Sequence, residues 1–408
     1  MTAFSKLLAI RAFSLVGVLG QNVILIRFFS LDEIGVYYLL ATVAYLGNAA
    51  VFVGADFNLQ KVCASSLRNN GIFYSDLQDY FLKIGFAGGA LVLAAAAVYF
   101  SIIGHANVVS IFLCAGLSIA MFLSNALKNL LQLSSQPVRS AYANLFEAIA
   151  KALIIAAVAG MGLRTAHSAI AASALAAVLT AAFSLVMLAP FCHAGRNHRY
   201  IKGVVDTTKK IAPVGISGIV NWAQLQGYRP YAAIAFGSET VGAVGFLTTL
   251  GSTAANTLFS VISQMNMSRL YASNGATAGK YIRDISVAAL FSMIVIVPAG
   301  YCFLIAVNRT NLLPLAYLLV AGVLVEYGNA MLGLATNFAN VLGLRLWFVS
   351  ISSAMGFLVA VITLLAHRFF QSAELNIACA LVFGQVACCV TAWVALSPPF
   401  RHWSLGPK

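Results

Sequence analysis

Twelve apolar stretches follow one another along the chain and are separated mostly by short polar turns. A membrane-spanning helix needs about 20 mostly apolar residues, so each stretch predicts one span. Only 9% of the 408 residues are charged and 61% are hydrophobic, whereas a soluble domain carries about 25% charged residues. The sequence therefore predicts an all-α polytopic membrane protein with spans at 7–29, 34–57, 80–104, 107–133, 139–162, 166–190, 209–236, 240–267, 282–308, 312–341, 344–366 and 374–397.

The basic residues are distributed unevenly between the two sides of this predicted topology. The even-numbered turns, both termini and their flanks hold 18 of the 24 Lys and Arg residues. The opposite side holds Arg27, Arg164, Arg309 and Arg368, and the remaining two lie within spans. Cytoplasmic turns carry an excess of Lys and Arg, so both termini are expected to be cytoplasmic. The net charge of +13 then reflects topology and contact with anionic phospholipid rather than a nucleic-acid partner.

Residue patterns typical of disulfide frameworks, metal centres and ATP sites are missing from the sequence. The seven cysteines are odd in number and form no CxxC pair, and the six histidines do not cluster. No G-x-x-x-x-G-K-[ST] loop occurs. We therefore expect no catalytic residue, metal or cofactor, and the first helix is expected to serve as its own insertion signal.

A short internal repeat divides the chain into two halves. Phe29-Ser30-Leu31-Asp32-Glu33-Ile34-Gly35 matches Phe236-Gly237-Ser238-Glu239-Thr240-Val241-Gly242 at an offset of 207. Each copy joins the first predicted span of a half to the second. Because six spans separate the copies, both halves enter the membrane in the same direction, as in transporters with parallel repeats. The expected domains are an N-terminal six-helix half (1–190), a basic cytoplasmic linker (191–208) and a C-terminal six-helix half (209–408).

The seventh span carries a polar face that lipid would not tolerate. At 100° per residue, one stripe holds Asn221, Gln224 and Tyr228, and the neighbouring stripe holds Trp222, Gln226 and Arg229. An unpaired polar group in hydrocarbon costs several kcal/mol. We expect this face to line a water-filled cavity inside a helix bundle. Pro213, Gly215 and Gly218 interrupt the start of the span, as in mobile or substrate-lining segments.

Further charged residues lie at membrane depth, where ionisable groups indicate function by default. Arg11 lies in the first span, where it either contacts a substrate or extends to the interface. Glu147 and Lys151 are four residues apart on one helix and are expected to pair there, either structurally or in transport. Glu326 has no cation near it in the sequence, so burial should raise its pKa and allow proton coupling; the alternative is a protonated acid bonded to a neighbouring helix.

Two hairpins resemble those of the polysaccharide-transport branch of the multidrug/oligosaccharidyl-lipid/polysaccharide (MOP) exporter superfamily, in particular the O-antigen-unit flippases. The family's first hairpin reads roughly R-x-L-G-x-x-x-[FY]-G-x-Y, and here Arg27-Phe28-Phe29-Ser30-Leu31-Asp32-Glu33-Ile34-Gly35-Val36-Tyr37 occupies that place. In the seventh span many relatives carry D-[RK], twelve residues and a glycine, and here Tyr228-Arg229 precede Gly242 at that distance. Because Tyr228 replaces the acid, no ion-coupling role is transferred to it.

The resemblance implies two six-helix bundles arranged in a V. It implies export of undecaprenyl-pyrophosphate-linked oligosaccharide repeat units, for O-antigen, lipopolysaccharide or exopolysaccharide, across a bacterial inner membrane. Ion-gradient coupling and alternating access would drive export, with Glu326 and Glu147 as candidate coupling residues. The expected partners are the lipid-linked glycan, anionic phospholipid, a polysaccharide polymerase and a chain-length regulator.

Other classes of protein remain open at this stage. A drug or small-molecule antiporter of the same superfamily is disfavoured by the few acids within spans. A sugar porter of the major facilitator type would carry G-x-x-x-D-R-x-G-R-[RK] after its second span, where this chain reads Leu59-Gln60-Lys61-Val62-Cys63. A membrane-embedded polymerase or ligase would show a long outward loop with clustered Arg or His. A scaffold would leave the polar face of the seventh span unexplained.

Overall fold

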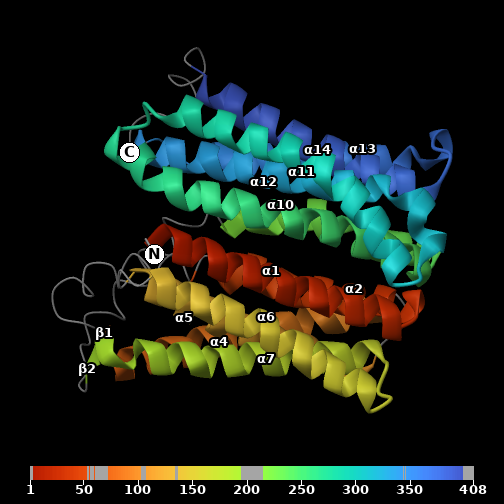
Figure 1. Ribbon diagram of the computed structural model, residues 1–408, viewed down its shortest axis with the longest axis horizontal. Coiled ribbons are helices and arrows are strands. Elements are labelled where there is room, and N and C mark those ends of the chain that lie inside the picture. The colour runs from red at the N-terminus through yellow and green to blue at the C-terminus, as the bar shows by residue number, and fades with distance from the viewer. Residues whose placement is uncertain are drawn as a thin grey trace. The chain divides into compact units, whose positions relative to one another are not determined.

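The computed structural model describes residues 3–52, 55, 59, 72–102, 107–133, 137–193, 215–342, 344 and 346–397. These residues are almost entirely helical (Figure 1). The chain divides into two compact units, Met1–Gly218 and Ile219–Lys408. Several expected features lie outside the described residues: most of the linker 191–208, Lys61, Arg68, Arg196, Arg199, Lys202, Lys209, Lys210, Pro213, Arg345, Arg401 and Lys408.

The first unit is a bundle of long helices. Its elements are α1 (Ala3–Phe28), α2 (Leu31–Gly47) with the π-turn η1 (Asn48–Phe52), α4 (Tyr74–Ile102), α5 (Val108–Leu133), α6 (Pro137–Gly160), α7 (Ala166–Leu188) and the 3₁₀ turn η2 (Ala189–Phe191). Two-residue strands, β1 (Ile72–Phe73) and β2 (Cys192–His193), form one short parallel pair.

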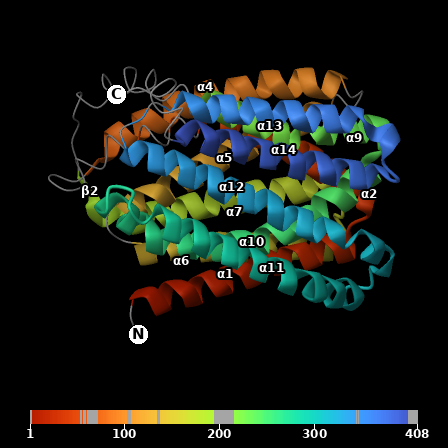
Figure 2. The same ribbon diagram turned by 90° about the horizontal axis from the view of Figure 1, so that it is seen from above.

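The second unit repeats this plan. Helical residues 215–226 cross the boundary between the units and are followed by α9 (Tyr228–Phe236), α10 (Ser238–Ala272) and α11 (Ala278–Ala306). The 3₁₀ turn η3 (Thr310–Leu315) leads to α12 (Tyr317–Val341), α13 (Trp347–Leu365), the 3₁₀ turn η4 (His367–Phe369) and α14 (Ala373–Leu396). In Figures 1 and 2, α10 to α14 run side by side.

The observed helices confirm the fold class expected from the sequence. Each of the twelve expected spans coincides with one helix or with two consecutive helical segments. Within the described residues, nine helices are long and apolar enough to cross a membrane. The tenth expected span begins late, because residues 310–315 form a 3₁₀ turn around Pro314 and the α-helix starts only at Tyr317.

The two copies of the internal repeat occur at equivalent turns. In the first unit, α1 ends at Phe28 and the Ser30 hydroxyl accepts a 3.2 Å bond from the Glu33 amide at the start of α2. In the second unit, α9 ends before Gly237. The φ angle of Gly237 is +88°, a conformation that residues with a side chain rarely adopt. Equivalent helices then have largely equivalent neighbours: the pairs α2–α4, α2–α5, α2–α7, α4–α5, α5–α7 and α6–α7 correspond to α10–α11, α10–α12, α10–α14, α11–α12, α12–α14 and α13–α14. Within the described residues, the contact between α5 and α6 has no comparable counterpart between α12 and α13. The repeat therefore extends well beyond the seven matched residues.

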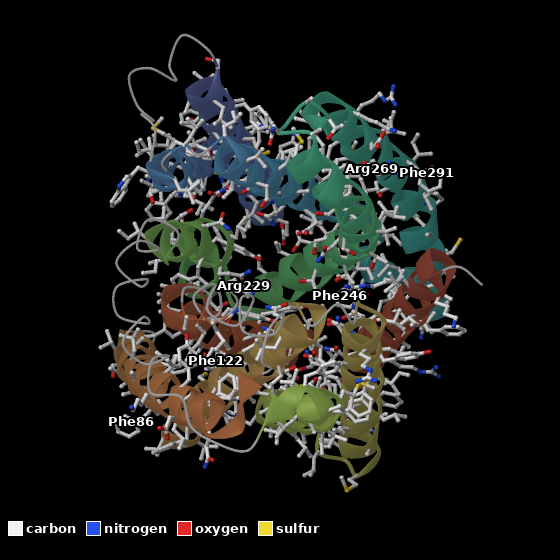
Figure 3. All side chains as sticks on the ribbon, turned by 90° about the vertical axis from the view of Figure 1, so that its left-hand side faces the viewer. Phe86, Phe122, Arg229, Phe246, Arg269 and Phe291 are labelled. Carbon is white, nitrogen blue, oxygen red and sulfur yellow. The ribbon has the colours of Figure 1, made fainter. Side chains whose placement is uncertain are left out.

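Each unit has a packed aromatic core and an apolar exterior. In the first unit the rings of Phe52 and Phe122 stack with centroids 4.4 Å apart, and in the second unit Phe246 is fully buried. Phe86 and Phe291 point outward, as Figure 3 shows, and Phe86 is 82% exposed. Large apolar side chains that face outward along whole helices are typical of a surface solvated by lipid.

The backbones of α10 and α12 approach each other closely at two glycines. A Cβ placed on Gly251 would collide with the Leu319 carbonyl, and one on Gly322 would collide with the Thr248 carbonyl. Small residues at such crossings allow membrane helices to pack backbone against backbone. This reciprocal contact joins α10 and α12 into one closely packed pair.

Candidate functional site

The polar seventh span is divided into two helical segments at Gly227. Helical residues 215–226 end there, and α9 begins at Tyr228. Pro230 lies in the first turn of α9, where it provides no N–H for the carbonyl four residues earlier. The interruption therefore follows from Pro230, whereas Gly215 and Gly218 lie inside the preceding helical segment.

Gln224, at the centre of the expected polar face, is buried rather than exposed to water. Its side chain is packed against α13 and α14 and only 2% of the residue is exposed. The expectation that the whole stripe lines a water-filled cavity is therefore wrong for this residue. The reason is that a hydrogen-bond partner on another helix, Gln385 of α14, takes the place that water would occupy.

A chain of four side chains crosses three helical segments of the second unit. Gln224 Nε2 donates to Gln385 Oε1 at 2.8 Å, and Gln385 Nε2 donates to Asn329 Oδ1 at 3.0 Å. Asn329 Nδ2 donates to Glu326 Oε2 at 3.3 Å. All three amides therefore donate toward the carboxylate. We call Gln224, Gln385, Asn329 and Glu326 the amide chain.

Three glycines provide the space that the amide chain occupies. A Cβ on Gly328 would collide with the Gln385 side chain. A Cβ on Gly356 would lie 2.5 Å from Gln224 Oε1 and 2.7 Å from the Gly384 carbonyl oxygen. Gly384 in turn borders Gln224 Nε2, 3.2 Å from its own hypothetical Cβ. Two buried glutamine side chains fit between these helices because the neighbouring positions carry no side chain.

The other residues of the polar face lie near the amide chain along the sequence but do not belong to it. Asn221 Oδ1 and Gln226 Oε1 are buried oxygens without a hydrogen-bond partner among the described residues. Trp222 is half-buried. Arg229, labelled in Figure 3, is 5% exposed; its Nε donates to the Tyr228 hydroxyl at 3.4 Å and its Cζ lies 5.8 Å from that ring centroid.

The first unit contains an ion pair that the sequence did not predict. Lys128 Nζ on α5 donates to Glu147 Oε2 on α6 at 2.5 Å, and the Ser124 hydroxyl donates to the same oxygen at 3.4 Å. The Lys128 side chain is 9% exposed. The expected pairing of Glu147 with Lys151 is therefore wrong, because the acid is oriented toward α5 rather than along its own helix.

Lys151 lies beside phenols. Its ammonium group donates a hydrogen bond to the Tyr37 side chain of α2, and Tyr45 and Glu147 lie within electrostatic range. Within the described residues, Lys151 forms no ion pair, because Glu147 is bonded to Lys128. Lys151 is thus a half-buried cation that has a neutral partner.

Arg11 is half-buried on α1, and its Nε is a buried donor that lacks a partner among the described residues.

The structure joins Gln224 to Glu326 and Glu147 to Lys128, and it places Lys151 beside Tyr37. Across the described residues, no three His, Cys, Asp or Glu side chains are grouped so as to hold a metal ion. Sequence reasoning missed Lys128 and Gln385.

The fold is similar to that of solved membrane proteins. Its helices form two related units, and several solved structures with a similar arrangement are described as transporters of the MOP superfamily. The chain is similar to the MATE multidrug transporter DinF-BH with 12% identity over 97% of this chain and 96% of that chain, at a TM-score of 0.61. It is also similar to the Vibrio cholerae MATE transporter VcmN with 12% identity over 98% and 97%, at 0.59.

A third similar structure is a MOP superfamily transporter from Pyrococcus furiosus, with 14% identity over 96% of this chain and 93% of that chain, at a TM-score of 0.54. No protein-family model and no curated protein matches the sequence. At these low identities the similarity shows the fold alone. The chain is a multi-pass membrane protein with the fold of MATE transporters of the MOP superfamily.

Proposed function

We propose that this protein is a flippase that moves undecaprenyl-pyrophosphate-linked oligosaccharide repeat units across a bacterial inner membrane by alternating access. The similar solved structures are described as transporters, which supports membrane transport as the general activity. The resemblance of both hairpins to O-antigen-unit flippases supports the substrate class.

The position of Lys151 is the observation that carries the substrate assignment. A diphosphate needs cations that are not already neutralised, because removing an anion from water costs several kcal/mol unless a counter-charge meets it. Glu147 forms its ion pair with Lys128 and lies only within electrostatic range of Lys151, whose hydrogen bond goes to Tyr37. A lysine held by a phenol exchanges that neutral partner for a phosphate oxygen at little cost.

Two further features of the chain suit a sugar diphosphate. Arg11 and Arg229 are additional cations at membrane depth in the first and seventh spans. Asn221 and Gln226 each have a buried oxygen that accepts no bond among the described residues, and hydroxyl groups of sugars are donors that such oxygens bind. We assign Arg11, Lys151 and Arg229 to the diphosphate, and Asn221, Trp222, Gln226 and Tyr228 to the glycan. Gln224 is left out of this assignment, because it is buried and bonded to Gln385.

We further propose that Glu326 couples transport to a proton gradient. It lies in the interior of a span and no cation neutralises it among the described residues, and its described side-chain bond comes from Asn329. Glu147 is bonded to Lys128 and is therefore assigned a structural role instead of a coupling role. Both termini are assigned to the cytoplasm. The proposed partners are anionic phospholipid, a polysaccharide polymerase and a chain-length regulator.

The test uses purified full-length protein in liposomes that contain a fluorescent undecaprenyl-pyrophosphate oligosaccharide. A membrane-impermeant quencher added outside reports how much labelled lipid has reached the outer leaflet. We expect faster exchange with the wild-type protein than with protein-free liposomes, and loss of that exchange in Lys151→Met. Equal rates with and without protein would refute the assignment.

An antiporter of organic cations is the second candidate, because the similar structure DinF-BH is described as a multidrug transporter. For the Pyrococcus furiosus protein, the reverse polarity of its binding pocket is described as suggesting a different function. The same fold therefore need not serve a single substrate polarity. A fluorescent organic cation in the same liposomes separates the candidates: uptake of that dye without exchange of the lipid-linked glycan would favour the antiporter.

A further inference from the structure

The amide chain has a direction, and that direction is set at its carboxylate end. An ionised carboxylate only accepts hydrogen bonds, so Asn329 must turn its NH₂ toward Glu326. The Asn329 oxygen then accepts from Gln385, and the Gln385 oxygen accepts from Gln224. The last free polar atom is Gln224 Oε1, which is buried and has no hydrogen-bond partner among the described residues.

This orientation leaves an unsatisfied acceptor at the far end of the amide chain. Gln224 Oε1 and the Gly384 carbonyl oxygen lie on the same side of Gly356, 2.5 Å and 2.7 Å from the point where its Cβ would be. Both atoms are acceptors, so neither satisfies the other. A buried acceptor without a donor costs about 1–3 kcal/mol, and this cost occurs where helical residues 215–226 pack on α13 and α14.

Protonation of Glu326 removes the constraint on direction. A proton taken up from the medium turns one carboxylate oxygen into an O–H donor, which then bonds the Asn329 oxygen. Each amide rotates by half a turn about its terminal bond, and every hydrogen bond of the amide chain is remade with donor and acceptor exchanged. Gln224 then presents its NH₂ group beside the Gly384 carbonyl, so a donor faces an acceptor.

We propose that Asn329 and Gln385 are positioning residues that transmit the protonation state of Glu326 to Gln224, and thereby control how firmly helical residues 215–226 pack on α13 and α14. With Glu326 protonated the packing is complete, and with Glu326 ionised it is weakened. This inference rests on the proposed function only in its purpose, since the same segment carries residues assigned to the glycan. The amide chain itself requires no substrate.

The surroundings of Glu326 leave this switch free of competing charges among the described residues. Helix α12 packs on α10, α11 and α14. The described charged and titratable groups on those helices are terminal, bonded elsewhere or thiols: Glu239 and Arg269 on α10; Lys280, Tyr281, Arg283, Asp284, Tyr301 and Cys302 on α11; Glu374, Cys379, Cys388 and Cys389 on α14. Asp284 accepts from Asn266, Tyr281 donates to Ser263, and Cys389 donates to the Gly328 carbonyl. On α12 itself, Tyr327 bonds Ser286.

The test follows Trp222, two residues before Gln224, by ¹⁹F NMR of full-length protein labelled with 5-fluorotryptophan and kept free of substrate. The Trp222 signal is assigned by its loss in Trp222→Phe. We expect this signal to shift with pH in the wild-type protein and to lose that shift in Glu326→Gln. Gln385→Met must also abolish the shift. In this variant Glu326 and Asn329 are still bonded to each other, but the link from Asn329 to Gln224 is removed.

Asn329→Leu cuts a second link, so the test still holds if Gln385→Met fails to fold. Tyr327→Phe is the matched control, because it removes the bond to Ser286 beside Glu326 without touching the amide chain, and it must keep the wild-type shift. Two results overturn the inference. One is a Trp222 signal that does not move with pH in the wild-type protein. The other is a Trp222 signal that moves with pH in Gln385→Met and Asn329→Leu as much as it does in the wild-type protein. Since no substrate is present, a normal titration combined with absent lipid exchange would instead overturn the proposed function.

Discussion

Lys128 and Glu147 form an ion pair between α5 and α6, with Nζ and Oε2 2.5 Å apart. The Ser124 hydroxyl, one turn before Lys128 on α5, supports the same oxygen. The pair engages Glu147, which precedes Lys151 by four residues on α6. It therefore has two effects, one on the packing of α5 against α6 and the other on the electrostatic surroundings of Lys151.

Removal of one partner should destabilise the first unit more than removal of both. Glu147→Gln leaves a buried ammonium group unpaired, and breaking a buried pair in this way costs about 3–5 kcal/mol. The lower end applies, since Glu147 is partly exposed. Thermal unfolding of purified protein in detergent should show a clear decrease for Glu147→Gln and a smaller one for the double variant Lys128→Met/Glu147→Met.

The exchanged pair Lys128→Glu/Glu147→Lys provides the control, because it restores opposite charges at the same two positions. Unfolding near the wild-type temperature is expected. If Lys151→Met lowered stability as much as Glu147→Gln, the assignment of the pair to Lys128 would be contradicted.

Substitutions of Lys151 should affect transport more than folding. Lys151→Met removes a charge-assisted hydrogen bond to the substrate worth about 1.5–3 kcal/mol, which is roughly a tenfold or larger loss in exchange of the lipid-linked diphosphate. Lys151→Arg should retain part of the activity, since it keeps the charge. Initial exchange rates in liposomes, normalised to the amount of folded protein, measure the effect.

Tyr37→Phe tests the partner of Lys151. It removes the hydroxyl that holds the ammonium group but keeps the ring, so a smaller loss than in Lys151→Met is expected. Equal exchange rates in wild type and Lys151→Met would exclude Lys151 from substrate binding.

Small substitutions beside the amide chain should be disproportionately harmful. In Gly328→Ala the new methyl group overlaps the Gln385 side chain, and in Gly356→Ala it approaches Gln224 Oε1 to 2.5 Å. Such overpacking costs about 1–3 kcal/mol. Denaturation of each variant in detergent measures the change in stability.

Gly333→Ala is the matched control on α12, because its new Cβ has no other heavy atom within 4 Å. There the gain in helix propensity, about 0.5–1 kcal/mol, should stabilise the protein. A stability loss in Gly333→Ala similar to that in Gly328→Ala would show that the effect comes from α12 generally and not from the space around Gln385.

Transport by Glu326→Gln should become insensitive to an imposed proton gradient. The variant keeps an amide that bonds Asn329 but cannot bind and release a proton. Exchange of lipid-linked glycan should therefore proceed at one rate with or without the gradient, whereas the wild-type rate increases with it. A Glu326→Gln rate that still follows the gradient would exclude this residue as the coupling site.

The helices could be predicted from sequence because hydropathy is a local property. Each apolar stretch predicts its own span, and the repeat at Phe29 and Phe236 is a direct match between two short sequences. The side-chain pairing could not be predicted in the same way. A helical wheel compares only residues of one helix, so it joined Glu147 to Lys151 and could not find Lys128 on α5.

The amide chain was half visible in the sequence. Three of its members, Gln224, Asn329 and Glu326, stand out in the sequence as polar residues within apolar spans. No local sequence pattern indicates that they contact one another. Gln385 was the missing link, and the available signal was a single amide in the middle of the otherwise apolar helix α14. Its neighbours Gly356 and Gly384 gave a second signal, because space without side chains on two adjacent helices indicates a large group from elsewhere.

The reciprocal glycine contact between α10 and α12 limits how the second unit can change shape. Helices whose main chains touch at Gly251 and Gly322 have no side-chain layer to shear, so they should travel together as one rigid body. Bending during a transport cycle is then expected in the seventh span, at the interruption that Pro230 introduces next to Gly227. The second unit then combines a rigid helix pair with a helical segment that bends, and this segment carries the residues that we assign to the glycan.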